Sequence, residues 1–448
     1  MSEATITTPQ RDIEERLLKI RGGRTLRGEV PISGAKNAAL KAMAATLLTS
    51  DEVVLNNVPM LADVLSMAKL LQEFGAEVEV DRDRNRVRVR AEKISRTTAP
   101  PELFRPTRAS VVAAGPMLAR AGEVSFYMPG GDQIGRRPID VHLRGFQRLG
   151  ATIEHRSDQV IASGGSLRGA RIYMDYPSHT GTENLLMAAT MAAGKTVIVN
   201  ASVEPEVVWL GQLLNRMGAR IDGLGSPILT IEGVERLRGV SDYVPPDRLE
   251  AGSFAIAAVM TGGEVVLRDI REPHMLPLTE KLMEMGAEVW TSNDMMLVRA
   301  GKTLNAVDIQ TLPFPGFPTD LQAPFTALLT QANGVSRVHE RVYEDRLRYT
   351  TELQKMGADI RVERIGYSGG NGGELLATSA EVRGPARLHG ARVSAIDIRA
   401  AVCMVLAALV AEGETELDEV YHIDRGYEDF VAKLTAIGAD LEDTAPQL

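Results

Sequence analysis

Hydrophobic and polar positions along the chain repeat one pattern six times: an apolar helix stripe that ends in Gly-Ala, followed by an alternating strand. In the first copy, Val64, Met67 and Leu71 follow helical spacing and lie on one face. Gly75 then suits the left-handed residue that ends many helices, and Glu77–Val80 alternates as a half-buried strand does. The six glycines are Gly75, Gly150, Gly218, Gly286, Gly357 and Gly438, spaced 68 to 81 residues apart.

A second helix and strand precede these copies. Helices rich in Ala, Leu and Met lead through a tight turn into strands such as those in AGEVSFYMP and AGKTVIVNA. Units of about 70 residues are too long for a simple solenoid, so six units favour two domains of three units each, with the chain crossing near Val244–Pro246. The alternative is six unrelated α/β segments that share only a helix-ending glycine.

Composition narrows the class of protein. With 448 residues, 44% of them hydrophobic, the chain is long enough for two or three domains with large cores. The net charge of −9 and the lack of a basic run argue against a nucleic-acid partner, and no His or Cys cluster has metal-ligand spacing. The single cysteine, Cys403, lies in an apolar stretch that predicts a buried helix.

Nothing in the chain predicts secretion or membrane insertion. The first sixteen residues lack an apolar signal core, and the longest apolar stretch, Ala400–Ala411, is too short to span a bilayer. We therefore expect a cytoplasmic protein, and the single cysteine suits a reducing compartment.

The segment EVPISGAKN, Glu29–Asn37, predicts an anion site. A strand, a glycine turn and the start of the helix Ala38–Leu48 would present backbone N–H groups, and Lys36 adds a positive charge. The spacing is not that of a P-loop, because no GxxxxGK(S/T) run occurs. On this segment alone, a surface lysine is the more common interpretation.

The segment Met128–His142 predicts a loop, because it contains three glycines and two prolines. Such a loop, with Asp132, Arg136 and Arg137, could close over an anionic ligand. The alternative is an exposed turn with solvated charges.

Further charged residues stand near helix starts in the C-terminal half. A proline-rich segment precedes Asp320, and aspartate at a helix start also serves as an N-cap. Arg346, Asp397 with Arg399, and Arg425 lie at loop-to-helix junctions of different units, and such junctions in repeated units tend to converge on one face. Surface ion pairs, which contribute little to stability, are the alternative.

Eight motifs together resemble one protein family, the UDP-N-acetylglucosamine 1-carboxyvinyltransferases, which are enolpyruvyl transferases related to EPSP synthase. The resemblance runs from Lys19 to Leu441, almost the whole chain. The motifs, in order, are SGAKNAALK, TRAS, PGGDQIGRRPIDVH, PPDRLEAGSF, FPTDLQA, VYEDR, DIRAA and YHIDRGYE.

The resemblance implies an α/β (α+β) fold: a two-domain inside-out α/β barrel with six βαβαββ repeat units, three per domain. One domain would comprise 36–245 and carry a mobile loop with Asp132. The other would comprise 17–35 plus 246–448 and carry the charged junction residues, and 1–16 would be a flexible tail. The active site would lie between the domains and close when the sugar nucleotide binds.

The resemblance also implies the reaction. The enolpyruvyl group of phosphoenolpyruvate would pass to the 3-hydroxyl of UDP-N-acetylglucosamine, and phosphate would leave, by addition and then elimination. This is the first committed step of peptidoglycan precursor synthesis. It needs no cofactor and no metal, and its partners are the two small-molecule substrates, without nucleic acid or membrane. The oligomeric state stays open, and a monomer is compatible.

The resemblance assigns roles to residues of the matched motifs. Asp132 would be the general acid and Asp320 the general base, with Lys36 and Asp397 at the reaction centre. The residues that would bind phosphoenolpyruvate are Lys36, Asn37, Arg137, Arg346, Arg399 and Arg425, with its carboxylate at Arg346 and Arg399. The residues that would bind UDP-N-acetylglucosamine are Asn37, Arg108, Arg137, Pro138, Asp140, Val141, Ser178, Asp320 and Val342.

This chain departs from the family pattern at two places. Asp132 stands where many members have cysteine, and because a carboxylate is a poor target for epoxide alkylation, we expect resistance to fosfomycin. His179-Thr180-Gly181, next to Ser178, replaces the more usual Val-Gly-Ala, which leaves the exact nucleotide sugar open.

Two other functions stay open at this point. EPSP synthase shares the fold and phosphoenolpyruvate, but typically has a Ser-Lys-Ser-type run where this chain has Gly34–Asn37. A non-catalytic paralogue that senses a nucleotide sugar would explain the altered segment after Ser178. The presence of all the expected charged residues argues against such a sensor.

Overall fold

The computed structural model describes residues 16–104, 108–132, 134–135, 138–292, 294–367 and 374–444. The chain divides into two compact units. Unit 2 comprises Ser33–Asp247 and Pro313–Pro315, and unit 1 comprises the chain up to Ile32, Arg248–Leu312 and the chain from Gly316 onwards. The predicted domain limits of 36 and 245 stay a prediction, and of the predicted tail only Arg16 is among the described residues.

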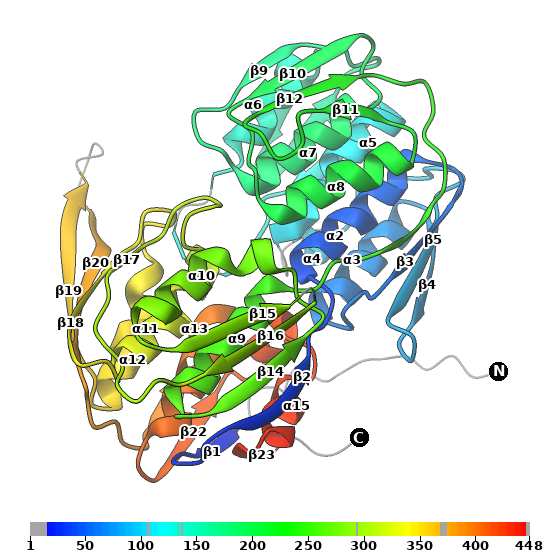
Figure 1. The fold of residues 1–448 in the computed structure, drawn as a ribbon. Coiled ribbons are helices and arrows are strands. Elements are labelled where there is room, and N and C mark those ends of the chain that lie inside the picture. Colours follow the sequence, from blue (N-terminus) through cyan, green and yellow to red (C-terminus); the bar gives the residue numbers. More distant parts are fainter. Residues whose placement is uncertain are drawn as a thin grey trace. The chain divides into compact units, whose positions relative to one another are not determined.

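Unit 1 contains three four-stranded sheets (Figure 1). Each sheet starts with a parallel pair of strands and continues with antiparallel neighbours. Their strand orders are β2 (Arg27–Pro31), β14 (Glu264–Arg268), β16 (Met295–Arg299), β15 (Glu288–Ser292); β17 (Ile309–Gln310), β18 (Gly334–His339), β20 (Glu374–Gly384), β19 (Asp359–Tyr367); and β21 (Arg392–Ser394), β22 (Glu414–Asp418), β1 (Leu18–Arg21), β23 (Asp440–Asp443).

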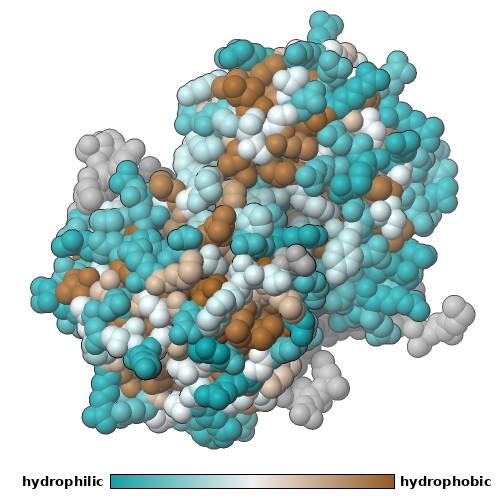
Figure 2. Space-filling model, in the orientation of Figure 1, coloured by the Kyte–Doolittle hydropathy of each residue, from teal (hydrophilic) through white to brown (hydrophobic). Residues whose placement is uncertain are grey.

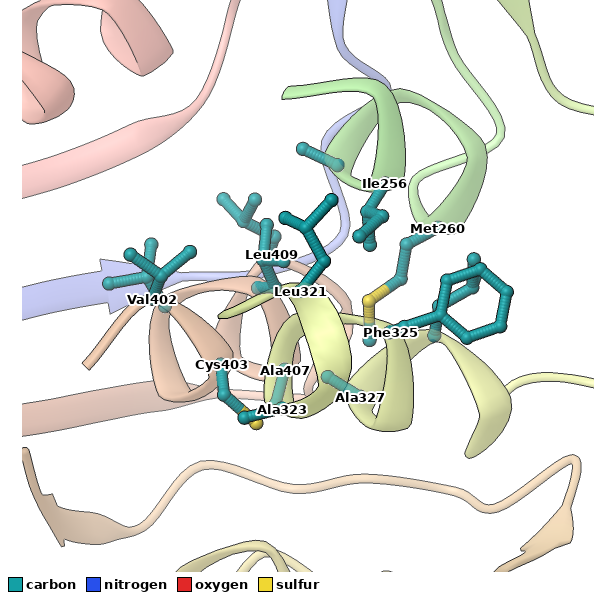
Figure 3. Packing of buried hydrophobic residues seen from close by; sticks show 14 of the residues in the cluster. Ile256, Met260, Leu321, Ala323, Phe325, Ala327, Val402, Cys403, Ala407 and Leu409 are labelled. Atoms are coloured by element: carbon teal, nitrogen blue, oxygen red, sulfur yellow. The ribbon is translucent and has the colours of Figure 1, made fainter. Parts of the chain in front are cut away.

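Three helices form the core of unit 1: α9 (Arg248–Met260), α11 (Gln322–Leu329) and α13 (Ile398–Val410). All residues of α9 and α11 are buried, so neither helix presents a solvated face. Small side chains such as Ala323 and Ala407 let the helices approach closely, while Phe325 and Met260 fill the space beside them (Figure 3). Cys403 is buried in α13, as predicted.

Shorter elements complete unit 1. They are α10 (Glu272–Glu284), α12 (Thr350–Lys355), α14 (Tyr421–Gly426), α15 (Phe430–Ala436) and the 3-10 turns η3 (Thr319–Leu321) and η4 (Arg346–Tyr349).

Unit 2 has three sheets and buried helices of its own; two of the sheets follow the plan of unit 1, and one has three antiparallel strands. The strand orders are β13 (Ser241–Tyr243), β3 (Glu52–Asn56), β5 (Arg86–Arg90), β4 (Glu77–Asp81); β6 (Glu123–Tyr127), β8 (Gln159–Ser163), β7 (Thr152–Arg156); and β9 (Arg171–Tyr173), β10 (Lys195–Val199), β12 (Ile228–Glu232), β11 (Arg220–Asp222). The helices are α2 (Lys36–Ala45) with η1 (Thr46–Leu48), α3 (Ala62–Glu73), α4 (Pro101–Phe104), η2 (Arg108–Ala113) with α5 (Ala114–Ala121), α6 (Asp140–Arg148), α7 (His179–Ala189) and α8 (Pro205–Arg216).

The predicted sixfold repeat is confirmed, and its Gly-Ala signature has a structural cause. All six glycines have positive φ angles between 96° and 108°. The alanine after each glycine donates its N–H to the carbonyl five residues earlier, as in Ala76 to Leu71 at 3.0 Å and Ala439 to Leu434 at 3.1 Å. This is the Schellman ending of a helix, and the alanine is buried each time. Glycine therefore supplies the backbone conformation, and alanine supplies a side chain small enough for the core.

The chain connects the units so that unit 2 is inserted into unit 1. Strand β2 leads directly into α2 of unit 2, yet β2 pairs with β14 of unit 1. Strand β13 leads into α9 of unit 1, yet β13 pairs with β3 of unit 2. The N-terminal β1 lies between β22 and β23 and completes the last sheet of unit 1.

The surface view in Figure 2 shows mostly hydrophilic residues, with the hydrophobic ones in separate patches. Of the helices in the described part of the chain, none could span a lipid bilayer. Across the same residues, no group of three or more His, Cys, Asp or Glu side chains has an arrangement that could hold a metal ion.

Candidate functional site

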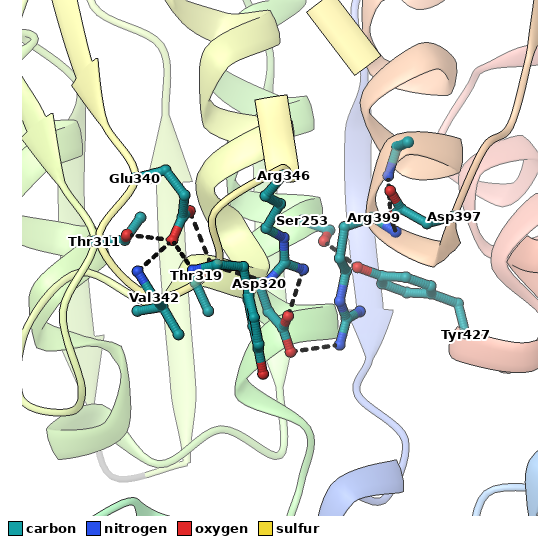
Figure 4. A network of polar contacts seen from close by, with 12 residues as sticks. Ser253, Thr311, Thr319, Asp320, Glu340, Val342, Arg346, Asp397, Arg399 and Tyr427 are labelled. Carbon is teal, nitrogen blue, oxygen red and sulfur yellow. Dashed lines mark hydrogen bonds and ion pairs between the residues drawn. The ribbon is translucent and has the colours of Figure 1, made fainter. Parts of the chain in front are cut away.

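Unit 1 contains a buried polar network that we call the Asp320 cluster: Thr319, Asp320, Glu340, Arg346 and Arg399 (Figure 4). Asp320 is the middle residue of η3, which leads directly into the buried helix α11. Its Oδ1 accepts a hydrogen bond from Arg346 Nη2 at 2.6 Å, and its Oδ2 accepts one from Arg399 Nη2 at 3.2 Å. The two arginine side chains are only 3% and 8% exposed, whereas that of Asp320 is 27% exposed.

Glu340, at the end of β18, anchors Arg346 through Thr319. Arg346 Nη1 donates to Thr319 Oγ1 at 2.9 Å, and the threonine hydroxyl donates to Glu340 Oε2 at 2.9 Å. Glu340 Oε1 accepts from Thr311 Oγ1 and from the backbone N–H of Val342, both at 2.8 Å. These hydrogen bonds offset the loss of hydration of a carboxylate that is only 2% exposed. The predicted residues Val342 and Arg346 are thus held by one buried side chain.

Asp397 positions Arg399 from the other side. It is the N-cap of α13, and its Oδ1 accepts from the backbone N–H groups of Arg399 at 2.8 Å and Ala400 at 3.0 Å. The Arg399 guanidinium lies 5.2 Å from the ring centre of Tyr427, which favours a cation–π contact. Arg425 lies on α14 and is half-buried.

Two alternative interpretations of these residues are wrong. Asp320 is not a helix N-cap, because Pro318 is the N-cap of η3 and Leu321 that of α11. Its carboxylate accepts from two guanidinium groups instead of backbone N–H groups. The alternative of surface ion pairs fails for Arg346 and Arg399, because both are buried.

Burial and charge act in opposite directions on the Asp320 cluster. Burial alone would raise the pKa of the Asp320 carboxyl, but Arg399 and Arg346 hold that pKa well below its usual range. Burial alone would lower the pKa of Arg346, but the charges of Asp320 and Glu340 raise it. In this state Asp320 is a firmly ionised and therefore weak base.

In unit 2, Lys36 is the first residue of α2 and is buried, so the interpretation as a surface lysine is wrong. Its Nζ lies 2.6 Å from Oδ2 of Asp63 on α3, with side chains 10% and 4% exposed. Asn37 follows and is half-buried. The predicted helix Ala38–Leu48 is confirmed as α2 with η1.

The loop before α6 brings Asp132 near Arg108. Gly131 has a φ angle of 92°, and a Cβ there would lie 3.2 Å from the backbone nitrogen of Arg108, the first residue of η2. Glycine therefore allows the loop to lie against η2, and the next residue, Asp132, is half-buried. The predicted ligand Arg137 and its neighbour Arg136 lie outside the described residues.

The start of α6 faces the start of α7. Ser178 is the N-cap of α7, and its Oγ accepts from Gly181 N at 3.1 Å. A Cβ at Gly181 would lie 2.9 Å from both Val141 Cγ1 and Ser178 Oγ. Glycine at this place of the unusual segment therefore lets Val141 and Ser178 approach one another. Asp140 is half-buried in the first turn of α6, after the exposed Pro138.

His142 ties α6 to the core of unit 2. Asn184 Oδ1 accepts from Gly115 N at 2.7 Å, so its Nδ2 must face His142 Nδ1, which lies 2.9 Å away. Since Nδ2 can only donate, Nδ1 accepts, and the imidazole is neutral. Burial, followed by the charge of Arg108, lowers the pKa of His142 to about 3.

We expect unit 2 to lose stability progressively as the pH falls from 6.5 to about 3 because of His142. An unfolded histidine titrates near 6.5, so acid protonates the unfolded state first, and at pH 5 this costs about 2 kcal/mol relative to neutral pH. Urea midpoints at pH 7.5 and pH 5 would measure this. His142→Gln should lose less free energy of unfolding between pH 7.5 and pH 5 than the wild type does. His389→Gln, at an exposed position, should lose as much as the wild type. An unchanged pH dependence in His142→Gln would contradict the assignment.

A buried charged group lies next to Ser178. His179 Nε2 is 3.2 Å from Oε1 of Glu183, one turn along α7, and Lys41 Nζ is 3.6 Å from Oε2 of the same carboxylate. Burial alone would lower the pKa of His179, but the charge of Glu183 raises it. The unusual His179 is thus paired inside unit 2.

The structure joins Asp320, Val342, Arg346, Asp397 and Arg399 in unit 1. Arg425 lies near the end of α14 in the same unit, and the other described candidates lie at helix starts and in one loop of unit 2. Sequence reasoning missed Glu340, Thr319 and Asp63. A charged residue directly after the alternating strand β18 was a signal for Glu340. A charged residue beside an apolar helix stripe was a signal for Asp63.

Comparisons with known proteins agree along the chain. A family model described as EPSP synthase (3-phosphoshikimate 1-carboxyvinyltransferase) matches residues 20–434. A UDP-N-acetylglucosamine 1-carboxyvinyltransferase of Magnetococcus marinus is 48% identical over 424 residues, which cover 94% of this chain and 98% of the relative. UDP-N-acetylglucosamine 1-carboxyvinyltransferase 2 of Carboxydothermus hydrogenoformans is 46% identical over 425 residues, with the same coverage of 94% and 98%.

Solved structures have the same fold. The enolpyruvyl transferase NikO from Streptomyces tendae has a TM-score of 0.85 at 24% identity, over 96% of this chain and 99% of that one. EPSP synthase from Acinetobacter baumannii has a TM-score of 0.72 at 17% identity, over 96% and 100%. At these identities the likeness concerns the fold alone, and it agrees with the predicted α/β architecture of six repeats.

Proposed function

Because the chain belongs to the EPSP synthase family, and within it to the UDP-N-acetylglucosamine 1-carboxyvinyltransferases, we propose that it transfers the enolpyruvyl group of phosphoenolpyruvate to the 3-hydroxyl of UDP-N-acetylglucosamine. The observation that carries the proposal is the similarity to these relatives along almost the whole chain. It is supported by the buried guanidinium pair at Asp320, which suits an anionic substrate.

Phosphoenolpyruvate is the substrate with the greatest demand for positive charge. In the proposal, Arg346 and Arg399 bind its carboxylate, because two forked guanidinium groups can donate to both carboxylate oxygens. Lys36, Arg137 and Arg425 bind its phosphate, with Asn37 beside Lys36. Binding fixes the substrate and contributes much of the acceleration by holding two reactants in line.

Proton transfer is assigned to two aspartates. In the addition step, Asp320 takes the proton of the sugar 3-hydroxyl while the hydroxyl oxygen bonds to C2 of phosphoenolpyruvate. Asp132 donates a proton to C3. In the elimination step, the Asp132 carboxylate takes a proton back from C3, the C2–O bond to phosphate breaks, the leaving phosphate takes the proton held by Asp320, and the double bond reforms. Asp397 assists by holding the start of α13, and with it Arg399.

UDP-N-acetylglucosamine is the proposed acceptor. Asn37, Arg108, Arg137, Pro138, Asp140, Val141 and Ser178 of unit 2, with Asp320 and Val342 of unit 1, are the proposed contacts. The close approach of Val141 and Ser178 at Gly181 supports a shared role for α6 and α7. The product would enter peptidoglycan precursor synthesis at its first committed step, in the cytoplasm, and so serve cell wall growth, cell shape and cell division.

Release of phosphate tests the function. We expect the purified protein to release phosphate from phosphoenolpyruvate with UDP-N-acetylglucosamine and not with 3-phosphoshikimate. Release with 3-phosphoshikimate alone would assign the chain to EPSP synthase. Nucleotide-sugar binding without release would instead support a non-catalytic sensor.

A further inference from the structure

Asp320 already accepts hydrogen bonds from Arg346 and Arg399, the two guanidinium groups that the proposed function assigns to the carboxylate of phosphoenolpyruvate. Each of its oxygens accepts from one arginine, Arg346 at 2.6 Å and Arg399 at 3.2 Å. Phosphoenolpyruvate offers the same chemical group, two carboxylate oxygens, to the same two guanidinium groups. Since these Nη2 atoms are already engaged, the described state is one in which the base and the substrate would compete.

We propose that the carboxylate of phosphoenolpyruvate displaces Asp320 from Arg346 and Arg399, and that this exchange frees Asp320 to act as the base. The inference rests on the proposed function, from which it takes the substrate and the role of Asp320. It adds that the base is inactive until the donor substrate binds.

The contacts indicate which partner moves. Arg346 is fixed by Thr319, and Thr319 is fixed by the buried Glu340. Arg399 lies in the first turn of the buried helix α13, where Asp397 Oδ1 accepts a hydrogen bond from its backbone N–H. Asp320 lies on a 3-10 turn, and its side chain is 27% exposed, several times more than those of the arginines. The guanidinium groups are therefore preorganised, and the aspartate is the partner that can turn away.

The exchange leaves the charge balance around the two arginines nearly unchanged, but it makes Asp320 more basic. Both arginines keep a carboxylate partner throughout, so no buried guanidinium is left unpaired. Arg399 and Arg346 hold the pKa of Asp320 well below its usual range, and a carboxylate so stabilised accepts a proton poorly. Once turned away, Asp320 is a stronger base for the sugar 3-hydroxyl.

Removing the competitor gives a measurable signature. Asp320→Asn keeps the shape but removes the charge, so we expect it to bind phosphoenolpyruvate about tenfold more tightly than the wild type, although it turns over far more slowly. The apparent affinity rises because the fraction of protein with available donors rises. Calorimetric titration with phosphoenolpyruvate, without acceptor, measures this. Unchanged or weaker binding would overturn the inference.

Two controls separate exchange from a general effect of charge. Glycerol 3-phosphate is a phosphate ester without a carboxylate. Its affinity for Asp320→Asn should exceed its affinity for the wild type by less than twofold. Asp345→Asn removes a charge one residue before Arg346, but its carboxylate faces Arg348 at 3.8 Å, so phosphoenolpyruvate affinity should stay within twofold of wild type. A tenfold gain with glycerol 3-phosphate would refute carboxylate exchange.

A measurement on the wild type is independent of how the variant folds. In a crystal structure with phosphoenolpyruvate, we expect the substrate carboxylate within hydrogen-bond distance of Arg346 and Arg399, and Asp320 beyond 4 Å from both guanidinium groups. Asp320 still bonded to both would overturn the exchange. Phosphate release by the wild type, assayed separately, shows whether the proposed function itself holds.

Discussion

Fosfomycin is expected to leave the activity of this protein unchanged after prolonged incubation, whereas Asp132→Cys is expected to lose activity progressively and irreversibly. The drug is an epoxide that alkylates a thiolate, and Asp132 offers a carboxylate instead. The only cysteine of the chain, Cys403, is buried in α13, and burial raises the pKa of its thiol well above the usual value. It is therefore not a reactive target.

The measurement is phosphate release after timed incubation with the drug, followed by dialysis. Ala119→Cys, at a half-buried position on α5, is the matched control for an introduced thiol and should stay active. Time-dependent, irreversible inactivation of the wild type would contradict the expected resistance. Such a result would also contradict the argument that the carboxylate of Asp132 protects the protein from epoxide alkylation.

Asp320→Ala is expected to lower kcat about a thousandfold, because general base catalysis contributes 10²–10⁴-fold and no other carboxylate accepts from both arginines among the described contacts. Steady-state phosphate release measures the loss. The variant also leaves two buried guanidinium groups without their partner, so its melting temperature should be compared.

The control for Asp320→Ala is Asp345→Asn, which lies in the loop before η4 and should keep kcat within twofold. A folded Asp320→Ala protein that retains more than a tenth of wild-type kcat would show that another group takes the proton. In that case the base would have to be sought elsewhere, and Asp320 would only orient the arginines.

The repeat architecture was predictable because its signal is local. Each Gly-Ala pair reports a helix ending that depends only on the five residues before it, and six copies made the count secure. The partners of β2 and β13 were not predictable from the residues of these strands, because each pairing depends on which distant strand it meets. Only the resemblance assigned 17–35 to the domain of 246–448. Nothing in the residues of β2 distinguishes β14 from β3 as a partner.

The candidate residues were predictable by type and by resemblance, but their environment was not. The sequence around Lys36 does not show that its side chain is buried against Asp63, because the two residues lie on different helices, α2 and α3. Asp320 fits the composition of a helix cap, and only the folded chain brings Arg346 of the same repeat and Arg399 of the next repeat to it. Glu340, which organises that cluster, belongs to none of the motifs that carry the resemblance.

The insertion of unit 2 has a consequence for synthesis of the protein. All three sheets of unit 2 draw their strands from between Glu52 and Tyr243, so they can assemble once this stretch has left the ribosome. Strand β1 emerges first, yet its partners β22 and β23 lie almost at the far end of the chain. A nascent chain therefore keeps its N-terminal strands unpaired while unit 2 folds, and unit 1 is completed last, after the C-terminal residues are released.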